Sequence, residues 1–293
     1  MHFGSLVAAL GSCLEARSQG GEWLLRMEDV DAPRCSMAAA DQILFTLEAY
    51  GFCWDGELIW QKSRTDSYEA ALADLKNKGL VFACACTRSE LAEAPLGSDG
   101  SIVYPGRCRQ GLPQGKNGRA WRLRVNRVEI SFSDQFQGRQ SAQLAVDAGD
   151  FVVFRADGFF AYQLAVVVDD AASGITHVVR GADLLHSTPR QIYLQRCLSL
   201  PTPSYAHLPV VINAAGEKLS KQTHAPALPE NEKVAQLISA LSVLGHPPPE
   251  PGNVVSLNEF WEWAITHWNS AAVPRKTVVQ APSSITPNPM DRV

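Results

Sequence analysis

Two lysines flanking a serine form a candidate phosphate-binding loop in the second half of the chain. Lys218, Ser220 and Lys221 follow a strand-like apolar run, 207–212, and a turn that contains Gly216. Such a loop can bring two point charges to a polyphosphate and can move as the phosphate charge shifts during a reaction. The same pattern is common on solvated turns, so it becomes informative only with a partner elsewhere in the chain.

The segment 2–5, His-Phe-Gly-Ser, is that partner, because it stands directly before the apolar run 6–10. A helix that begins here directs backbone N–H groups and the positive end of its dipole toward an anion. Gly4 permits close approach of the backbone, and His2 could donate a hydrogen bond to a phosphate oxygen. The alternative is an ordinary helix start with Ser5 near the cap.

Charged residues also follow two predicted strands. The buried run 23–27 leads into Glu28, Asp29 and Asp31, and the strand 175–179 leads into Arg180. An open α/β sheet places ligand-binding groups at the carboxyl ends of its strands. For the three acids, a solvated turn is the alternative interpretation.

Three cysteines and a tyrosine have a spacing suited to a metal ion. Cys84 and Cys86 lie in the predicted strand 80–86, where alternation puts both side chains on one face. Tyr104 and Cys108 flank a glycine turn further on. Three thiolates and one oxygen make a closed tetrahedral set for zinc, although tyrosine is an unusual ligand. The alternative is a group of buried structural cysteines.

Composition limits the class of protein. The chain has 293 residues, of which 46% are hydrophobic and 19% charged, as expected for a soluble globular protein. Its formal charge of −4 argues against a generally basic nucleic-acid binder but leaves room for a local basic groove. The 7 cysteines favour a reducing compartment with a metal site over a disulfide scaffold. We find no apolar run of about 18 residues and no export signal, so we expect a cytoplasmic protein without membrane contact.

Hydrophobic periodicity predicts alternating strands and helices, and therefore an α/β fold. We expect helices at 4–17, from Ser36 onward, and at 65–78, 187–198, 231–244 and 257–267. The apolar run 160–170 fits either a strand or a helix. The expected domains are a nucleotide-binding domain at 1–78 and 151–228, an inserted β-containing module with the cysteines at 79–150, a helical region at 229–273 and a disordered tail at 274–293.

As an ordered set, these motifs resemble those of class I glutamyl-type aminoacyl-tRNA synthetases. Residues 2–5 resemble the His-Ile-Gly-His nucleotide signature and residues 218–221 resemble Lys-Met-Ser-Lys-Ser, with the segments 26–31, 162–170 and 179–183 between them. Within that family the chain looks most like the short glutamyl-Q tRNA(Asp) synthetases. Three features point there: the serine of residues 2–5, the run 221–228, and the Cys-x-Cys and Tyr-x3-Cys pair of motifs.

The resemblance implies a Rossmann-like class I catalytic domain with an inserted zinc-binding module and a short helical C-terminal region. It implies ATP-dependent activation of L-glutamate and its transfer to queuosine in the anticodon of tRNA(Asp); we expect a monomer. It assigns glutamate binding to Glu28, Tyr162 and Arg180, and catalysis to His2 and Lys221. The implied ATP-binding residues are His2, Gly4, Lys218, Ser220 and Lys221. One structural zinc ion is implied at Cys84, Cys86, Tyr104 and Cys108, and Mg²⁺ accompanies ATP without a dedicated protein cage.

The N-terminus departs from the family pattern. Family members carry a strand and an Arg-Phe-Ala-Pro-Ser-Pro-x-Gly stretch ahead of the histidine, whereas here Met1 directly precedes His2. We therefore expect the first strand of the nucleotide-binding sheet to be absent, and this chain to be less active than one carrying that stretch. Two other hypotheses remain open: a truncated glutamyl-tRNA synthetase that acts on an acceptor end, and a catalytically inactive, zinc-containing binding protein.

Overall fold

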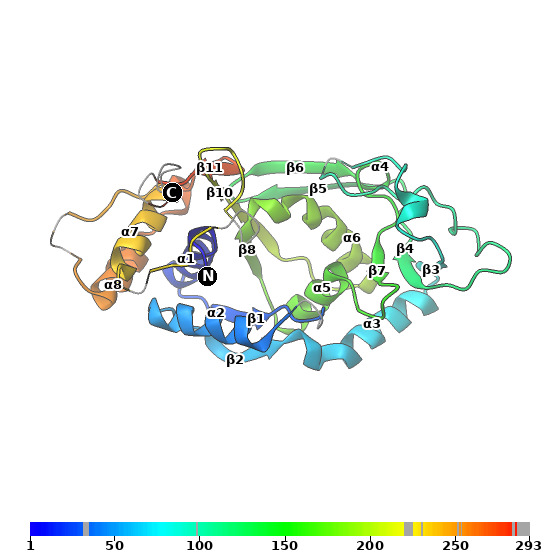
Figure 1. Ribbon diagram of the computed structural model, residues 1–293, viewed down its shortest axis with the longest axis horizontal. Helices are drawn as coiled ribbons and strands as arrows, with labels where there is room; N and C mark the ends of the chain where they lie inside the picture. The colour runs from blue at the N-terminus through cyan, green and yellow to red at the C-terminus, as the bar shows by residue number, and fades with distance from the viewer. Residues whose placement is uncertain are drawn as a thin grey trace, which may run out of the picture.

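The computed structural model describes residues 1–31, 35–97, 99–219, 225–229, 231–250, 252, 254–282 and 285. Ser220 and Lys221 of the predicted lysine loop therefore lie outside the described residues. Along the longest axis, helices α7 (Lys233–Val243) and α8 (Leu257–His267) occupy one end, and strands β3 (Val81–Cys84) and β4 (Ala120–Leu123) occupy the other (Figure 1).

Helices and strands alternate through most of the chain, as the periodicity predicts. The other α-helices are α1 (Phe3–Ser18), α2 (Met37–Ala49), α3 (Thr65–Asn77), α4 (Leu144–Asp147), α5 (Tyr162–Ala172) and α6 (Thr188–Leu198). The other strands are β1 (Leu24–Met27), β2 (Asp55–Trp60), β5 (Glu129–Asp134), β6 (Gly138–Gln143), β7 (Val152–Phe154), β8 (His177–Gly181), β9 (Ser204–Leu208), β10 (Val210–Ile212) and β11 (Val278–Gln280).

The largest sheet in the described part of the chain has the strand order β6-β5-β9-β8. β8 and β9 are parallel, β5 and β6 form an antiparallel hairpin, and β5 joins β9 in parallel at Asp134 and Tyr205. The sequence places residues 129–143 in the inserted module, yet here they extend the sheet that carries Arg180. Separately, β1 pairs in parallel with β2, and β3, β4 and β7 form an antiparallel sheet.

Helix α1 lies between the α7–α8 pair and β8 (Figure 1). It begins at Phe3 because His2 has an extended backbone and its Nδ1 accepts a hydrogen bond from the Ser5 N–H at 3.2 Å. Its apolar residues recur at three- and four-residue intervals, so one face enters the main hydrophobic core. A Cβ on Gly11 would lie 2.6 Å from Leu208 Cδ1, so glycine lets α1 approach the end of β9 closely.

The run 160–170, for which the sequence allows either a strand or a helix, forms helix α5 from Tyr162 onward. Most of its residues are buried, and Asp169 is fully enclosed. That carboxylate accepts hydrogen bonds from Gln61 Nε2 at 2.9 Å and from Tyr68 Oη at 2.6 Å, and pairs with Arg64. A buried charge is tolerated only when paired in this way, so these contacts fix α5 against α3.

The C-terminal segment differs from expectation in one place. β11 pairs in parallel with β10 through three residue pairs, so the prediction of a disordered tail is wrong for Val278–Gln280. Within the described residues, none of the helices has the length and apolar character needed to cross a membrane.

Candidate active site

A cavity of about 640 Å³ runs along the facing edges of β1 and β8 and includes the carboxyl ends of both strands. Glu28 follows β1, Arg180 stands near the end of β8, and Tyr162 opens α5; all three line this cavity. The structure therefore brings together the three residues to which the resemblance assigns glutamate binding. They come from three separate elements, and each is placed by the end of a strand or helix.

Most of the N–H donors of Arg180 are already hydrogen-bonded to neighbouring side chains. Its Nε donates to His207 Nε2 at 3.1 Å, and its Nη2 donates to Thr188 Oγ1 at 2.9 Å and to Gln191 Oε1 at 2.8 Å. Nη1 has only a long contact of 3.5 Å with Tyr162 Oη. A guanidinium has five N–H donors, and the protein uses the three on Nε and Nη2, so Nη1 is the nitrogen left to meet a ligand carboxylate.

Opposite Arg180, the cavity is acidic and contains its own ion pair. Arg26 Nη1 donates to Asp170 Oδ1 at 2.6 Å, whereas Arg26 Nη2 approaches Glu28 Oε1 only to 3.4 Å. The Glu28 side chain is 45% exposed, so its carboxylate can receive a cationic group. Burial raises the pKa of Tyr162, and the negative charge of Glu28 adds to this, so the phenol stays protonated and can donate a hydrogen bond.

The N-terminal segment and the lysine loop meet at the start of α1. A Cβ on Gly4 would lie 3.3 Å from the His2 ring and 3.6 Å from Leu219 Cβ. On the far side of the loop, Ala227 forms an antiparallel bridge with His2, and the Leu228 N–H donates to the Met1 carbonyl oxygen at 3.1 Å. Both flanks of the loop thus contact the N-terminus of α1, although Ser220 and Lys221 are not described.

Lys218 is the one loop lysine among the described residues. Its Nζ donates to Asp183 Oδ2 at 2.5 Å, and the Lys218 side chain is 50% exposed. A Cβ on Gly181 would lie 2.4 Å from Asp183 Oδ1, so a larger residue there would displace the Asp183 carboxylate. In this structure Lys218 therefore pairs with a carboxylate, and an arriving phosphate would compete for it.

The open edges of β1 and β8 border the same cavity. Among the described residues, β1 is paired only with β2 and β8 only with β9, while residues 23–26 and 175–180 line the cavity between them. In the part of the chain that the structure describes, no strand lies between these two edges.

The cysteine cluster lies at the end of the molecule that carries β3 and β4. β3 begins at Val81 and ends at Cys84, so the predicted strand 80–86 is too long by one residue at its start and two at its end. The three sulfurs of Cys84, Cys86 and Cys108 nevertheless lie within 4.8 Å of one another. Tetrahedral zinc requires S···S separations of about 3.8 Å and S···O separations of about 3.5 Å. Here Cys86 Sγ and Cys108 Sγ are 3.7 Å apart, and Tyr104 Oη lies 3.5 Å from the sulfurs of Cys84 and Cys86. The three sulfurs therefore lie close enough together to hold one metal ion, and the Tyr104 hydroxyl lies beside them.

The surroundings favour a thiolate at Cys84 but oppose one at Cys86, whose pKa is raised by burial. Burial opposes ionisation of Cys84, but its side-chain hydrogen bonds with Tyr104 and with Arg122, whose Nε donates to Sγ at 3.3 Å, lower its pKa overall. Arg122 also stacks over the Tyr104 ring at 4.0 Å, which orients the phenol. The hydrophobic cluster around these residues is small, with six buried members: Phe82, Cys84, Ala85, Leu91, Tyr104 and Cys108.

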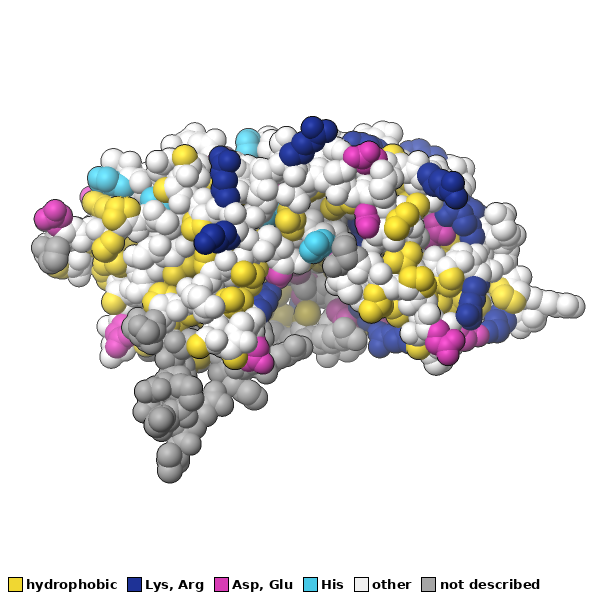
Figure 2. All heavy atoms as spheres, turned by 90° about the horizontal axis from the view of Figure 1, so that it is seen from above, with side chains coloured by type: hydrophobic (Ala, Val, Ile, Leu, Met, Phe, Trp, Pro, Cys, Tyr) yellow, Lys and Arg dark blue, Asp and Glu magenta, His cyan; other side chains and the backbone are white. Residues whose placement is uncertain are grey.

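Sequence reasoning missed the residues that hold Arg180. Asp134, Thr188, His207 and Gln191 are all buried, and all come from segments whose polar residues attract no attention in the sequence. The available signal is a polar side chain inside an apolar strand, since His207 lies in the run 204–212. On the face shown in Figure 2, Lys and Arg side chains are spread among acidic and hydrophobic ones and do not merge into a single patch.

Comparison with known proteins agrees with this geometry. Residues 1–274 match the family model described as tRNA synthetases class I (E and Q), catalytic domain. A glutamyl-Q tRNA(Asp) synthetase of Aromatoleum aromaticum is 55% identical over 97% of this chain and 90% of that protein. Another, of Chromobacterium violaceum, is 57% identical over 94% of this chain and 91% of that protein.

Solved structures support the fold. A glutamate-tRNA synthetase of Elizabethkingia anophelis superposes with a TM-score of 0.78 at 22% identity over 97% of this chain. The chain spans 66% of the length of that protein. The α/β class I catalytic fold expected from the sequence is thereby confirmed. The chain belongs to the class I glutamyl- and glutaminyl-type tRNA synthetase catalytic-domain family and, within it, to the glutamyl-Q tRNA(Asp) synthetases.

Proposed function

We propose that this chain activates L-glutamate with ATP and transfers it to queuosine in the anticodon of tRNA(Asp). The observation that carries the proposal is the meeting of Glu28, Tyr162 and Arg180 in one cavity, in a chain more than half identical to glutamyl-Q tRNA(Asp) synthetases over nearly its whole length. The start of α1 and both flanks of the lysine loop, which supply the nucleotide-binding motifs, lie against each other.

In the glutamate site, charge complementarity assigns the roles. Arg180 Nη1 receives the side-chain carboxylate of the substrate, and the exposed carboxylate of Glu28 receives the ammonium group. Tyr162 donates its phenolic hydrogen bond to the same substrate. An isolated carboxylate would not leave water for this cavity, so the paired guanidinium is what makes binding of glutamate favourable.

In the ATP site, the start of α1 and the lysine loop act on the phosphates. A carboxylate oxygen of glutamate attacks the α-phosphorus, the bond to the bridging oxygen breaks, and pyrophosphate leaves. His2 and Gly4 at the helix start, with Lys218, Ser220 and Lys221, stabilise the negative charge that accumulates on the phosphate oxygens. Mg²⁺ enters with ATP and supplies additional neutralisation. A hydroxyl of the cyclopentenediol of queuosine then attacks the glutamyl carbonyl and AMP leaves.

Cys84, Cys86, Tyr104 and Cys108 would hold one structural zinc ion. The set is closed, with no open position for water, so it organises the surrounding loops rather than performing chemistry. We further propose that the protein acts as a monomer in the cytoplasm. Its catalytic domain comprises residues 1–78 and 151–228, and the metal-binding module lies within 79–150.

Two assays test the function. Glutamate-dependent ATP–pyrophosphate exchange without tRNA should be detectable, and queuosine-containing tRNA(Asp) should accept glutamate whereas tRNA(Asp) without queuosine should not. Charging of tRNA(Glu) instead would favour a truncated glutamyl-tRNA synthetase. No exchange and no charging would favour an inactive binding protein.

Arg180→Lys tests the glutamate site. Lysine keeps the charge but loses the planar fork, so we expect a loss of about 1.5–3 kcal/mol in transition-state binding, or about 10- to 150-fold in kcat/KM for glutamate. The measurement is pyrophosphate exchange at varied glutamate concentration. Unchanged glutamate activation in this variant would remove Arg180 from the site.

A further inference from the structure

We propose that Asp134 and His207 form a positioning pair that orients the guanidinium of Arg180 for the substrate carboxylate. The inference rests on the proposed glutamate site and adds two residues that do not touch the cavity themselves. The three side chains form a row across three neighbouring strands. Asp134 ends β5, His207 lies in β9, and Arg180 is its direct partner in β8, in the register Arg180–His207.

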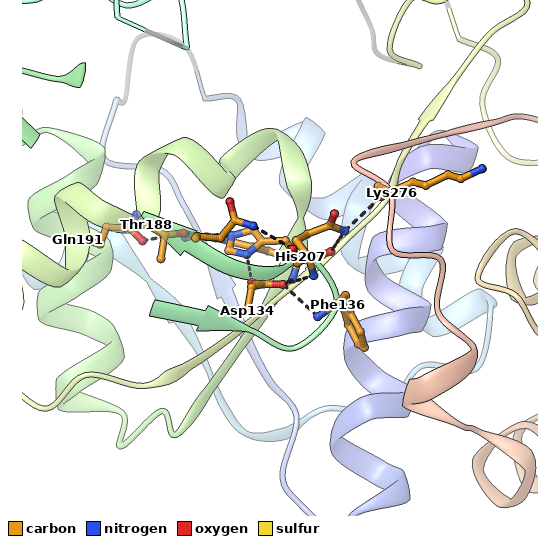
Figure 3. Close-up of polar contacts among 9 residues, drawn as sticks. Asp134, Phe136, Thr188, Gln191, His207 and Lys276 are labelled. Carbon is orange, nitrogen blue, oxygen red and sulfur yellow. Dashed lines mark hydrogen bonds and ion pairs between the residues drawn. The ribbon is translucent and has the colours of Figure 1, made fainter. Parts of the chain in front are cut away.

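Both carboxylate oxygens of Asp134 are occupied by hydrogen bonds within the protein. The side chains of Asp134 and His207 are both 0% exposed. Asp134 Oδ1 accepts backbone N–H groups of Phe136 at 3.1 Å, Gln137 at 2.8 Å and His207 at 3.1 Å. Its Oδ2 lies 2.5 Å from His207 Nδ1 (Figure 3). A carboxylate with this many donors stays ionised although it is buried, so it provides a fixed acceptor.

The hydrogen-bond pattern determines the tautomer of His207. Arg180 Nε can only donate, so His207 Nε2 must be the acceptor of the 3.1 Å hydrogen bond. The single proton of the neutral imidazole is therefore on Nδ1, where it is donated to Asp134. A protonated imidazole would point an N–H at the guanidinium. Asp134 thus sets the tautomer, and the tautomer presents a lone pair to Arg180.

The lone pair fixes which edge of Arg180 faces the substrate. Thr188 and Gln191 come from α6 and lie in the same group of polar side chains as His207 (Figure 3). Their oxygens take the two donors of Nη2, and His207 takes the donor of Nε. Because these three N–H groups are hydrogen-bonded, the guanidinium cannot rotate about the Cδ–Nε bond. Nη1 therefore remains directed to Tyr162 and the cavity. Without His207, the Nε edge loses its anchor.

Two substitutions separate positioning from packing. In His207→Asn, the amide N–H can still donate to Asp134 but nothing reaches Arg180 Nε. In His207→Gln, the longer amide can offer its oxygen to Arg180 Nε but gives up the bond to Asp134. His246→Asn is the matched control, because His246 is also buried but instead stacks on Trp268, away from Arg180.

The first readout is the KM of each substrate in pyrophosphate exchange by the full chain. We expect His207→Asn to raise the KM for glutamate about tenfold with the KM for ATP unchanged, and His207→Gln to restore part of the loss. His246→Asn should leave both KM values unchanged even if it lowers the melting temperature. In an Arg180→Lys background, His207→Asn should change the glutamate KM less than about twofold, because its target is gone. A glutamate KM that does not respond to His207→Asn, or that responds equally in both backgrounds, overturns the proposal.

The second readout needs no activity. In ¹⁵N-detected NMR of the full chain, His207 should be a neutral imidazole protonated at Nδ1 at pH 7, and its Nε2 resonance should shift in Arg180→Lys. An Nε2-protonated or doubly protonated ring overturns the proposal. If the wild-type chain lacks glutamate-dependent exchange, the proposed function fails, and the NMR result alone decides the inference.

Discussion

Replacing Cys108 by serine should remove metal from the cluster formed by Cys84, Cys86, Tyr104 and Cys108. Structural zinc in small peptides contributes about 10–16 kcal/mol, and sharing this among four ligands assigns about 2.5–4 kcal/mol to each. Loss of one thiolate should therefore weaken zinc binding between about 60-fold and about 700-fold. The estimate applies here because the sulfur and oxygen separations, 3.7 Å and 3.5 Å, already match a tetrahedral site.

The consequence for structure should be local. The surrounding hydrophobic cluster has only six buried residues, too few to hold the loops between β3 and β4 by themselves. We therefore expect faster proteolysis within 85–119 in Cys108→Ser, while glutamate activation is reduced much less. Cys53→Ser is the control, because Cys53 is an exposed free cysteine outside the cluster.

The assay is metal content of protein purified without chelator, followed by competition with a chromogenic zinc chelator. About one zinc ion per wild-type chain is expected. Wild-type protein without zinc would refute the proposed zinc site as a whole, including all four ligands. If zinc is present but Tyr104→Phe binds it as tightly as wild type, only the fourth ligand is wrong. Equal zinc affinity of Cys108→Ser and wild type would show that the cluster is not the site.

Stability should fall as the pH drops below about 6.5, because burial lowers the pKa of His207 and the unfolded chain then takes up a proton that the folded chain does not. The pKa of Asp134 is also lowered in the folded protein, because the effect of burial is outweighed by its hydrogen bonds with His207 and Gln137. Protonation of Asp134 therefore adds a further loss of stability as the pH falls below about 4. Urea unfolding between pH 8 and 5 measures the first effect, and an equal slope in His207→Asn would contradict the assignment. Gly245→Ala should destabilise the fold by more than about 1 kcal/mol, since φ is +86° and a Cβ would lie 2.1 Å from the Ala272 carbonyl oxygen. Gly158→Ala, at φ +89° with open space around it, should show the backbone contribution alone, and equal losses in the two variants would contradict the clash.

Local patterns were sufficient for the elements that carry strong periodicity. Helix α8 has the predicted bounds; α3 and α6 differ from prediction by one residue at one end, and α1 by one residue at each end. Each of these helices has a capping residue or an apolar stripe that can be recognised from residues close together in the sequence. The run 160–170 could not be decided locally, because it is short and mostly apolar, and such a run fits a buried strand as well as a helix.

Pairing between distant segments could not be read from local patterns. Nothing in residues 129–143 shows that β5 joins β9, because an antiparallel hairpin has the same alternation wherever it docks. The short strand β11 lies in a segment rich in proline and serine, and only its pairing with β10 identifies it as a strand. A strand of three residues is stabilised by its neighbour rather than by its own sequence.

The sequence by itself determined which groups this protein could use. Glu28, Tyr162 and Arg180, the segment 2–5, the lysine loop and the cysteines were all recognisable because each motif is continuous and its chemistry depends on residue type. Only the tertiary structure decided how Arg180 is presented. Its orientation depends on Asp134 and His207, which lie 46 and 27 residues away in sequence but adjacent across the sheet. Hydrogen bonds depend on distance and direction in space, and strand pairing sets those independently of chain separation.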